Sequence, residues 1–325
     1  MSQGLPYFER FLHTFPTVHD LANAELDEVL KLWEGLGYYS RARNLHKGAK
    51  YISENGVPKN YESWLKVPGV GPYTAAAVSS FAFDENVAVV DGNVQRVLAR
   101  LYHINEPVNS SSGQKLVQSY ADELIKDEPA AEHNQAIMEL GALVCTPKNP
   151  KCKECPFTSY CLARAANAQS ELPIKLKKTK VKKVELNYTA VYGKTGMYFQ
   201  QRPTIGIWGG LYEMHPLSPE EIELPKASSI YSSTYKVEHL LSHRKLQITI
   251  KKVELKGEEP REISGLKHST WKEVDQLAFP KPIRAWLDEK LLPLHDTFEG
   301  WFTTFDRNRL KINYVRFTKQ SNAHW

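Results

Sequence analysis

The spacing of hydrophobic residues changes character near the middle of this chain. In the first half, apolar residues recur at i, i+3, i+4 and i+7, the spacing that gives a helix one apolar face. This pattern predicts helices over residues 26–33, 94–101 and 116–124. Asp91 stands just before the second of these, where a helix would begin. We therefore expect residues 1–168 to form an all-α domain.

In the second half, short alternating or aromatic-rich runs replace the helical spacing. They cover residues 186–192, 197–201 and 246–253, with glycine and proline between them, and such runs predict β-strands. Residues 282–292 favour one more helix. Residues 185–295 are therefore expected to form a second domain of the α+β class.

A lysine-rich stretch separates the two halves. Between Leu172 and Lys183 there are six lysines and no acidic residue, which predicts a linker over residues 169–184. Two interpretations stay open: a solvated connector, or a segment that also follows a phosphate backbone. Residues 296–325 are rich in aromatic and basic side chains and receive no assigned role. A chain of 325 residues is long enough for two cores.

The composition is that of an ordinary intracellular globular protein. Hydrophobic residues make up 42% and charged residues 24% of the chain, and no apolar run approaches the roughly 18 residues that a membrane span needs. The first residues lack a basic segment followed by an apolar core, so a secretory signal is not expected and the predicted location is the cytoplasm. The net charge of +5 is a modest hint of a polyanionic partner.

All four cysteines of the sequence lie close together at the end of the helical half. Their spacing is C-x6-C-x2-C-x5-C. Because cytosolic thiols stay reduced, such a group is more often a set of metal ligands than of disulfides. Thiolates select zinc or iron-sulfur, and spacing alone does not choose; zinc ribbons usually carry two C-x2-C pairs, so the single pair favours iron-sulfur. The expected ligands are Cys145, Cys152, Cys155 and Cys161.

A glycine-rich turn joins two helical stretches near residue 70. Gly69, Val70 and Gly71 precede Pro72, a residue that often opens a helix. Glycines let a backbone approach a phosphate, and the helix start beyond them points free N–H groups and a positive dipole at the same anion. A tight helical turn also needs glycine, so both a DNA grip and a plain turn remain possible.

Asp91 has two possible roles as well. Aspartate is among the best residues for capping a helix N-terminus, and capping alone would explain it. A carboxylate at a helix mouth can also stay ionised, oppose a developing cation or orient a water molecule.

These segments, in this order, resemble the MutY adenine DNA glycosylases, a family of helix-hairpin-helix glycosylases. The resemblance covers about residues 6–295. It is carried by the run Trp33-Glu34-Gly35-Leu36-Gly37-Tyr38-Tyr39, the glycine turn, Val90-Asp91-Gly92-Asn93-Val94, Leu140-Gly141-Ala142 and the cysteine spacing.

The resemblance implies a fold and an activity. It implies an all-α helix-hairpin-helix glycosylase domain with an iron-sulfur loop at residues 145–161, followed by an α+β Nudix-like domain. It further implies one 4Fe-4S cluster, held by the four cysteines. The implied enzyme is a monomeric base excision repair glycosylase of the bacterial cytoplasm, associated with the nucleoid. It would remove adenine opposite 8-oxoguanine or guanine from double-stranded DNA by hydrolysis of the N-glycosidic bond.

Several residue roles follow from the resemblance. Asp91 matches the catalytic aspartate, which would stabilise an oxocarbenium-like sugar. Tyr73 matches a tyrosine of the adenine pocket. Lyase-type relatives carry a lysine there, so tyrosine argues for a monofunctional enzyme with no Schiff base. Tyr38 matches an aromatic wedge beside 8-oxoguanine, and a core aromatic after a helix end is the other interpretation that the sequence allows. Gly69, Val70 and Gly71 would grip the DNA backbone.

The second half resembles the family's Nudix-like domain. Residues 203–212 fit one of its loops, and Leu241-Ser242-His243 stands where the family usually has Phe-Ser-His. Ser242 and His243 would contact the lesion on the opposite strand. The acidic Nudix box is absent from the sequence, so hydrolysis of nucleoside diphosphates is not expected.

One departure from the family bears on catalysis. The family carries a Glu-x-x-x-x-Gln-Gln-Thr helix, whose glutamate protonates adenine, just before an Ile-Pro-Tyr-Phe segment; this sequence reads Met1-Ser2-Gln3-Gly4-Leu5 before the matching Pro6-Tyr7-Phe8. Glu9 lies after that segment and does not match. Loss of a general acid costs a factor of about 10²–10⁴, so we expect impaired activity and exposed apolar surface near Trp33. The alternatives are a fragment or mispredicted start of a normal enzyme, a catalytically silent mispair-binding protein, a zinc-stabilised DNA-binding module and, less favoured, a lyase-type glycosylase.

Overall fold

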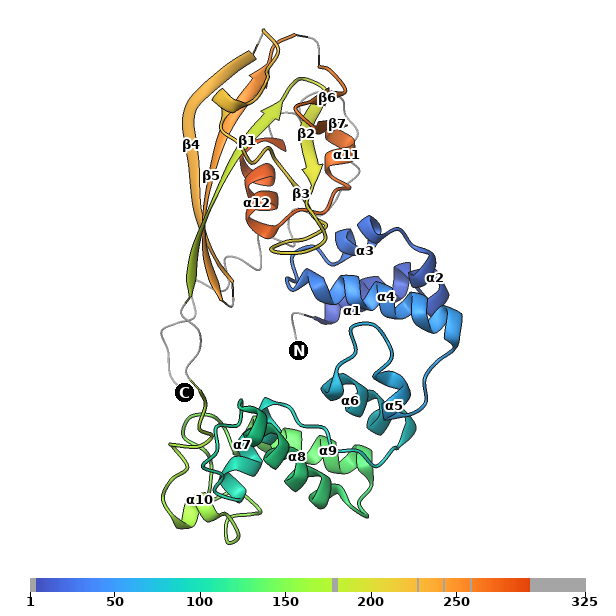
Figure 1. Ribbon diagram of the computed structural model, residues 1–325, viewed down its shortest axis with the longest axis vertical. Coiled ribbons are helices and arrows are strands. Elements are labelled where there is room, and N and C mark those ends of the chain that lie inside the picture. Colours follow the sequence, from blue (N-terminus) through green and yellow to red (C-terminus); the bar gives the residue numbers. More distant parts are fainter. Residues whose placement is uncertain (1–3, 177–180, 227, 242, 258, 293–325) are drawn as a thin grey trace.

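The computed structural model describes residues 4–292 except 177–180, 227, 242 and 258. Figure 1 shows three parts in space, with helices α1–α4 lying between the sheet-containing part and helices α6–α10. None of the helices among the described residues is long and apolar enough to cross a membrane.

The first half is helical, as the sequence predicts. The predicted helices at 26–33, 94–101 and 116–124 are confirmed as α3, α7 and α8, and each buries its apolar stripe. The helices of this half are α1 (Leu5–Thr14), α2 (Val18–Asn23), α3 (Leu26–Leu32), α4 (Tyr39–Asn55), α5 (Tyr61–Trp64), α6 (Pro72–Phe83), α7 (Gly92–Leu101), α8 (Ser111–Ile125), α9 (Ala130–Glu139), the π-helical turn η1 (Leu140–Val144) and α10 (Leu162–Ala165).

The second half is built on one mixed sheet, ordered β4-β5-β1-β2-β7-β6, with β3 paired to β2. Its elements are β1 (Lys182–Tyr192), β2 (Gly196–Gln201), β3 (Tyr212–Glu213), the 3₁₀ turn η2 (Pro219–Glu221), β4 (Ser228–Leu241), β5 (Arg244–Leu255), β6 (Glu262–Ile263), β7 (Leu266–Thr270), α11 (Trp271–Val274) and α12 (Lys281–Lys290). The three predicted strands and the last predicted helix are confirmed as β1, β2, β5 and α12.

Strand β1 begins inside the stretch predicted to be a linker. It starts at Lys182 because residues 182–184 pair in parallel with residues 244–246 of β5. Its far end is buried on both faces, as expected of a central strand: Tyr188 and Ala190 belong to one hydrophobic cluster and Val191 to another.

The hydrophobic clusters do not coincide with the helical and sheet halves of the chain, because one cluster contains residues of both. One cluster joins Leu30 of α3 and Ala42 of α4 to Leu211, Phe279 and Trp286 of the second half. A separate cluster lies within the α7–α9 region. Helices α1–α4 are therefore packed on the sheet domain as part of a shared core.

Several helices of the first half, α1 and α6 among them, expose large apolar side chains. Trp33 is half-buried, with its ring edge-on to Phe11 at 5.6 Å between centroids. On α1 the exposed apolar side chains are Leu5, Phe8 and Leu12, and on α6 they are Tyr73, Phe81 and Phe83; others lie on α4, η1 and α10, such as Leu45, Leu143 and Leu162.

Candidate functional site

The glycine turn predicted to grip DNA lies between α5 and α6. Gly69 has φ +83°, and a β-carbon there would come within 2.3 Å of the Asn44 β-carbon, so packing against α4 alone requires glycine. Gly71 is the N-cap of α6 and Pro72 opens the helix. Among the described residues no side chain caps α6, so the first amides of the helix remain suited to an anion.

Asp91 is the N-cap of α7. Its Oδ1 accepts hydrogen bonds from the backbone N–H groups of Asn93 at 2.8 Å and Val94 at 2.7 Å. Its Oδ2 accepts one from the side-chain amide of Asn93 at 2.9 Å. The capping interpretation is therefore confirmed. The same contacts hold a half-buried carboxylate in one orientation, which is what stabilisation of a developing cation requires.

A chain of hydrogen bonds leads from Asp91 to the cysteine loop. Asn93 accepts from Arg96 Nη2 at 2.9 Å, and Arg96 Nε donates to the carbonyl oxygen of Cys145 at 2.7 Å. Arg96 also donates to the Gly141 carbonyl at 2.6 Å. A β-carbon at Gly141 would lie 2.7 Å from the Asn93 β-carbon, so glycine is what lets η1 approach α7. Burial lowers the pKa of Arg96.

The four cysteines converge. Cys145, Cys152, Cys155 and Cys161 line one cavity of about 30 Å³ together with Arg100. No three His, Cys, Asp or Glu side chains among the described residues are arranged to hold a single metal ion. Four half-buried thiols around a shared space supply the thiolate ligands that an iron-sulfur cluster would need. Burial raises the pKa of the Cys155 thiol. Metal coordination would act in the opposite direction, because it favours the deprotonated thiolate.

Arg100 braces this loop from α7. It is 2% exposed, and its Nη1 lies 3.3 Å from Cys145 Sγ. The same guanidinium donates to the carbonyl oxygens of Thr146 at 2.8 Å, Pro147 at 3.2 Å and Leu172 at 3.1 Å. The loop is therefore fixed both to α7 and to the start of the linker.

Tyr73 stands 50% exposed at the start of α6 and lines a cleft of about 660 Å³. Val90 and Gln95 line the same cleft, whereas Asp91, between them in the chain, is not among its described lining residues. The rest of its polar lining consists mainly of amide side chains, including Asn86 and Gln118. Amides and a tyrosine hydroxyl are groups that bind the edges of a base.

Tyr38 lines a second cleft, of about 700 Å³, between the helical part and the sheet domain. Tyr38 is the N-cap of α4, has φ 50° and is 63% exposed, so it is not a core aromatic. The exposed His243 lines the opposite wall, while Ser242 lies outside the described residues. The two clefts share no lining residue, so Tyr38 and His243 form one group and Tyr73 another.

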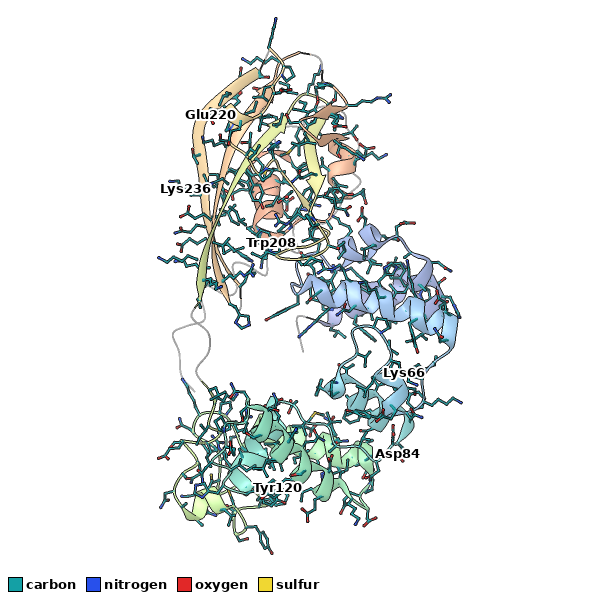
Figure 2. All side chains as sticks on the ribbon, viewed as in Figure 1. Lys66, Asp84, Tyr120, Trp208, Glu220 and Lys236 are labelled. Carbon is teal, nitrogen blue, oxygen red and sulfur yellow. The ribbon has the colours of Figure 1, made fainter. Side chains whose placement is uncertain are left out.

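The interdomain cleft is cationic. Its charged lining residues include Arg43, Arg244 and Lys281, and none of the described residues that line it is acidic. His239 also lines it; burial, and secondarily Lys281, lowers its pKa. Trp208 closes the sheet side, and Figure 2 places it at the end of that domain facing the helices. Such a lining suits a nucleic-acid strand.

Several of these residues were not predicted. Asn93 and Arg96 carried a weak signal, since they lie three residues apart on one helix next to Asp91. Arg100 and Arg43 carried none, because the carbonyl groups that they bond are distant in sequence. Lys281 carried none either, because the cleft that it lines forms only in the folded protein.

Three family models match the chain. Residues 2–122 match the HhH-GPD superfamily base excision DNA repair protein, residues 145–161 the iron-sulfur binding domain of endonuclease III, and residues 188–289 the NUDIX domain. The chain therefore carries a 4Fe-4S cluster, and the preference for iron-sulfur over zinc is confirmed; the matched segment contains all four cysteines, the predicted ligands. The predicted architecture, a helix-hairpin-helix domain followed by a Nudix-like domain, is confirmed as well.

Curated relatives agree with these models. The chain is 36% identical to the adenine DNA glycosylase of Buchnera aphidicola subsp. Baizongia pistaciae, over 64% of this chain and 60% of the relative. It is 31% identical to that of Buchnera aphidicola subsp. Schizaphis graminum, over 88% of this chain and 86% of the relative. A solved thermostable thymine-DNA glycosylase is similar at 26% identity and a TM-score of 0.46, over 50% of this chain and 76% of that one.

Proposed function

Because this chain belongs to the adenine DNA glycosylase family, we propose that it removes adenine paired with 8-oxoguanine, or with guanine, from double-stranded DNA. The reaction is hydrolysis of the N-glycosidic bond, in the course of base excision repair in the bacterial cytoplasm. The observation that carries the proposal is the carboxylate of Asp91, oriented at the start of α7 by two backbone amides and the Asn93 side chain.

Each residue group has a role in this reaction. An adenine turned out of the duplex enters the cleft beside Tyr73, where amide side chains bind its edges. As the bond to the sugar breaks, positive charge develops on the sugar ring, and the Asp91 carboxylate opposes it and orients the attacking water. Tyr73 offers no amine, so no Schiff base forms and the product keeps an intact strand with an abasic site.

The interdomain cleft takes the other strand. Its cations bind phosphates, Tyr38 inserts beside the base opposite adenine, and His243, together with Ser242, contacts 8-oxoguanine. The amides at the start of α6, following Gly69, Val70 and Gly71, bind the backbone of the adenine strand. The cysteine loop that follows η1 would hold the 4Fe-4S cluster, and Arg96 ties that loop to Asn93 and so to Asp91.

A second function is favoured by one observation. Asp122 is the one acidic side chain among the described residues that line the cleft beside Tyr73. No glutamate, the residue type that protonates adenine in the family, is among them. Adenine leaves readily only when protonated, so impaired excision, or recognition of the mispair without excision, is the alternative.

A single-turnover assay separates the two functions. The substrate is an end-labelled duplex with one adenine opposite 8-oxoguanine, mixed with excess protein and then treated with alkali to cut abasic sites. We expect release at least about 10²-fold faster than for Asp91→Asn. Release no faster than that variant, with retained preference for the damaged duplex, would establish the silent binder. Borohydride should trap no covalent adduct, and an adduct would instead favour a lyase-type enzyme.

A further inference from the structure

One carboxylate ties the turn between α3 and α4 to the sheet domain. Glu34 lies in this turn, four residues before Tyr38, with 14% of its side chain exposed. Its Oε1 accepts a hydrogen bond from the backbone N–H of Phe279 at 2.8 Å and another from Arg284 Nε at 3.3 Å. Its Oε2 accepts one from Lys31 Nζ at 2.8 Å. A carboxylate so covered and so fully bonded is an anchor, unlike a solvated surface charge.

The backbone of the same turn is held from two more sides. Tyr7 donates its hydroxyl proton to the carbonyl oxygen of Glu34 at 2.9 Å. The Tyr39 hydroxyl accepts from the Gly35 N–H at 3.2 Å and donates to the Phe279 carbonyl at 3.3 Å. Phe279 therefore contacts the turn with both its N–H and its C=O group.

The shape of the turn requires this support. Gly35 and Gly37 have φ of +92° and +82°, and Tyr38 has φ 50°, a conformation that residues with a β-carbon rarely adopt. Trp33 donates from Nε1 to the Gly37 carbonyl at 2.8 Å. Any shift of Glu34 would move the chain that places Tyr38 on the cleft wall.

The segment that binds Glu34 also forms the other wall. Phe279 is fully buried, with its ring 4.9 Å from that of Phe199. Two residues further on, Lys281 lines the same cleft as Tyr38, and so does Trp208. Residues 277–284 thus contact the Tyr38 turn on one side and the cleft on the other.

We propose that Glu34 is a positioning residue that fixes the two walls of the interdomain cleft relative to each other and so contributes to the choice of the base opposite adenine. This inference rests on the proposed function. Glu34 itself touches no substrate. It sets the spacing between Tyr38 on the helical wall and His243 on the sheet wall, and a base that contacts both walls is bound selectively only if that spacing is fixed.

The test compares Glu34→Ala with Asp288→Asn. Asp288 is the matched control because it also faces Arg284, at 3.6 Å, yet is 56% exposed and does not contact the turn. For Glu34→Ala we expect the preference for 8-oxoguanine over guanine opposite adenine, measured as a ratio of dissociation constants, to fall about tenfold. The single-turnover release rate at saturating protein should change less than about twofold, a split that general loss of folding would not produce.

A second readout does not depend on catalysis. Hydrogen exchange should become faster in Glu34→Ala at the Phe279 amide and at residues 35–39, and should be unchanged there in Asp288→Asn. Glu34→Gln should restore part of the protection, because its amide oxygen can still accept from Phe279 but no longer carries the charge facing Lys31 and Arg284.

The outcomes are distinct. Unchanged exchange and unchanged preference in Glu34→Ala would overturn the inference, and so would equal losses in Asp288→Asn. A wild-type protein without preference for either opposite base would overturn it as well. If the wild-type protein prefers the damaged duplex but releases no adenine, excision as the proposed function fails, while binding preference and exchange still decide the role of Glu34.

Discussion

The side-chain amide of Asn93 lies 2.9 Å from the carboxylate of Asp91, and it donates a hydrogen bond to the oxygen that bonds no backbone amide in the helix cap. One carboxylate oxygen of Asp91 therefore caps the N-terminus of α7, and the other is oriented by its hydrogen bond from Asn93. Arg96 in turn holds Asn93 and reaches the carbonyl oxygen of Cys145. Asp91 is thus linked to the cysteine loop through two side chains.

Asn93→Ala removes the bond to Oδ2 and leaves the helix cap in place. A hydrogen bond to a charged group contributes about 1.5–3 kcal/mol, so misorientation of the carboxylate should slow adenine release about 10- to 100-fold. The measurement is single-turnover release from the duplex containing 8-oxoguanine, with circular dichroism to confirm that the helices persist. Release at the wild-type rate would show that Asn93 does not orient Asp91.

Arg100→Gln should destabilise the cysteine loop. The buried guanidinium bonds three carbonyl groups and contacts Cys145 Sγ, and a hydrogen bond from a charged group contributes about 1.5–3 kcal/mol. We expect the iron and sulfide content per purified chain to fall by about half or more. Lys151→Gln is the control, since Lys151 lies on the same loop but is exposed and its ion pair with Glu154 spans 4.0 Å. Equal cluster content in both variants would contradict this role of Arg100.

The helices and strands could be predicted because local spacing decides them. The stripe of Val94, Val97 and Leu98 is buried on α7, and the alternation around residue 248 places Leu246, Ile248 and Ile250 in one cluster. Strand order could not be predicted in this way. Strand β1 lies beside β5, which follows it by some sixty residues, and such pairing depends on tertiary packing.

The candidate site shows the same division. Asp91 and the cysteines stood out because capping and ligand spacing are local patterns. The bond from Arg96 to Cys145 joins residues 49 positions apart, and that from Glu34 to Phe279 joins residues 245 apart. Neither hydrogen bond produces a spacing pattern that the sequence would reveal. The placement of Leu30 and Ala42 in the core of the sheet domain was hidden for the same reason.

His46 makes stability depend on pH. It is 5% exposed, its Nε2 lies 3.0 Å from the Ala24 carbonyl oxygen, and burial, more than the nearby Lys50, lowers its pKa below the ordinary 6.5. The unfolded chain therefore binds a proton at a higher pH than the folded protein does. Stability should be fully present above pH 6.5 and should fall as the pH decreases from 6.5 toward the pKa of the folded protein.

His46→Gln tests this dependence, because glutamine can still donate to Ala24 but does not titrate. Denaturant midpoints measured between pH 7.5 and 5.5 should fall less steeply for the variant than for the wild type. His133, His215 and His239, whose pKa values are also lowered by burial, remain in both proteins and cancel in the comparison. Parallel pH profiles would show that His46 does not contribute.

Leu30→Ala probes the core that α3 and α4 share with the sheet domain. Leu30 is fully buried, and a β-carbon added at Gly210 would stand 3.4 Å from its Cδ1, so α3 packs directly on the loop before β3. Truncation should cost about 2–5 kcal/mol. Because the core is shared, hydrogen exchange should become faster at the amides of α3 and of β1 together.

Leu98→Ala supplies the matched comparison. Leu98 is equally buried, but it belongs to the cluster of the α7–α9 region. The same loss of side-chain volume there should raise exchange in α7–α9 and leave β1 protected. If helices α1–α4 instead unfold with α7–α9, Leu98→Ala will raise exchange in α3, and Leu30→Ala will leave β1 unchanged. The pair of variants therefore decides whether the cooperative unit follows the shared core or the order of the chain.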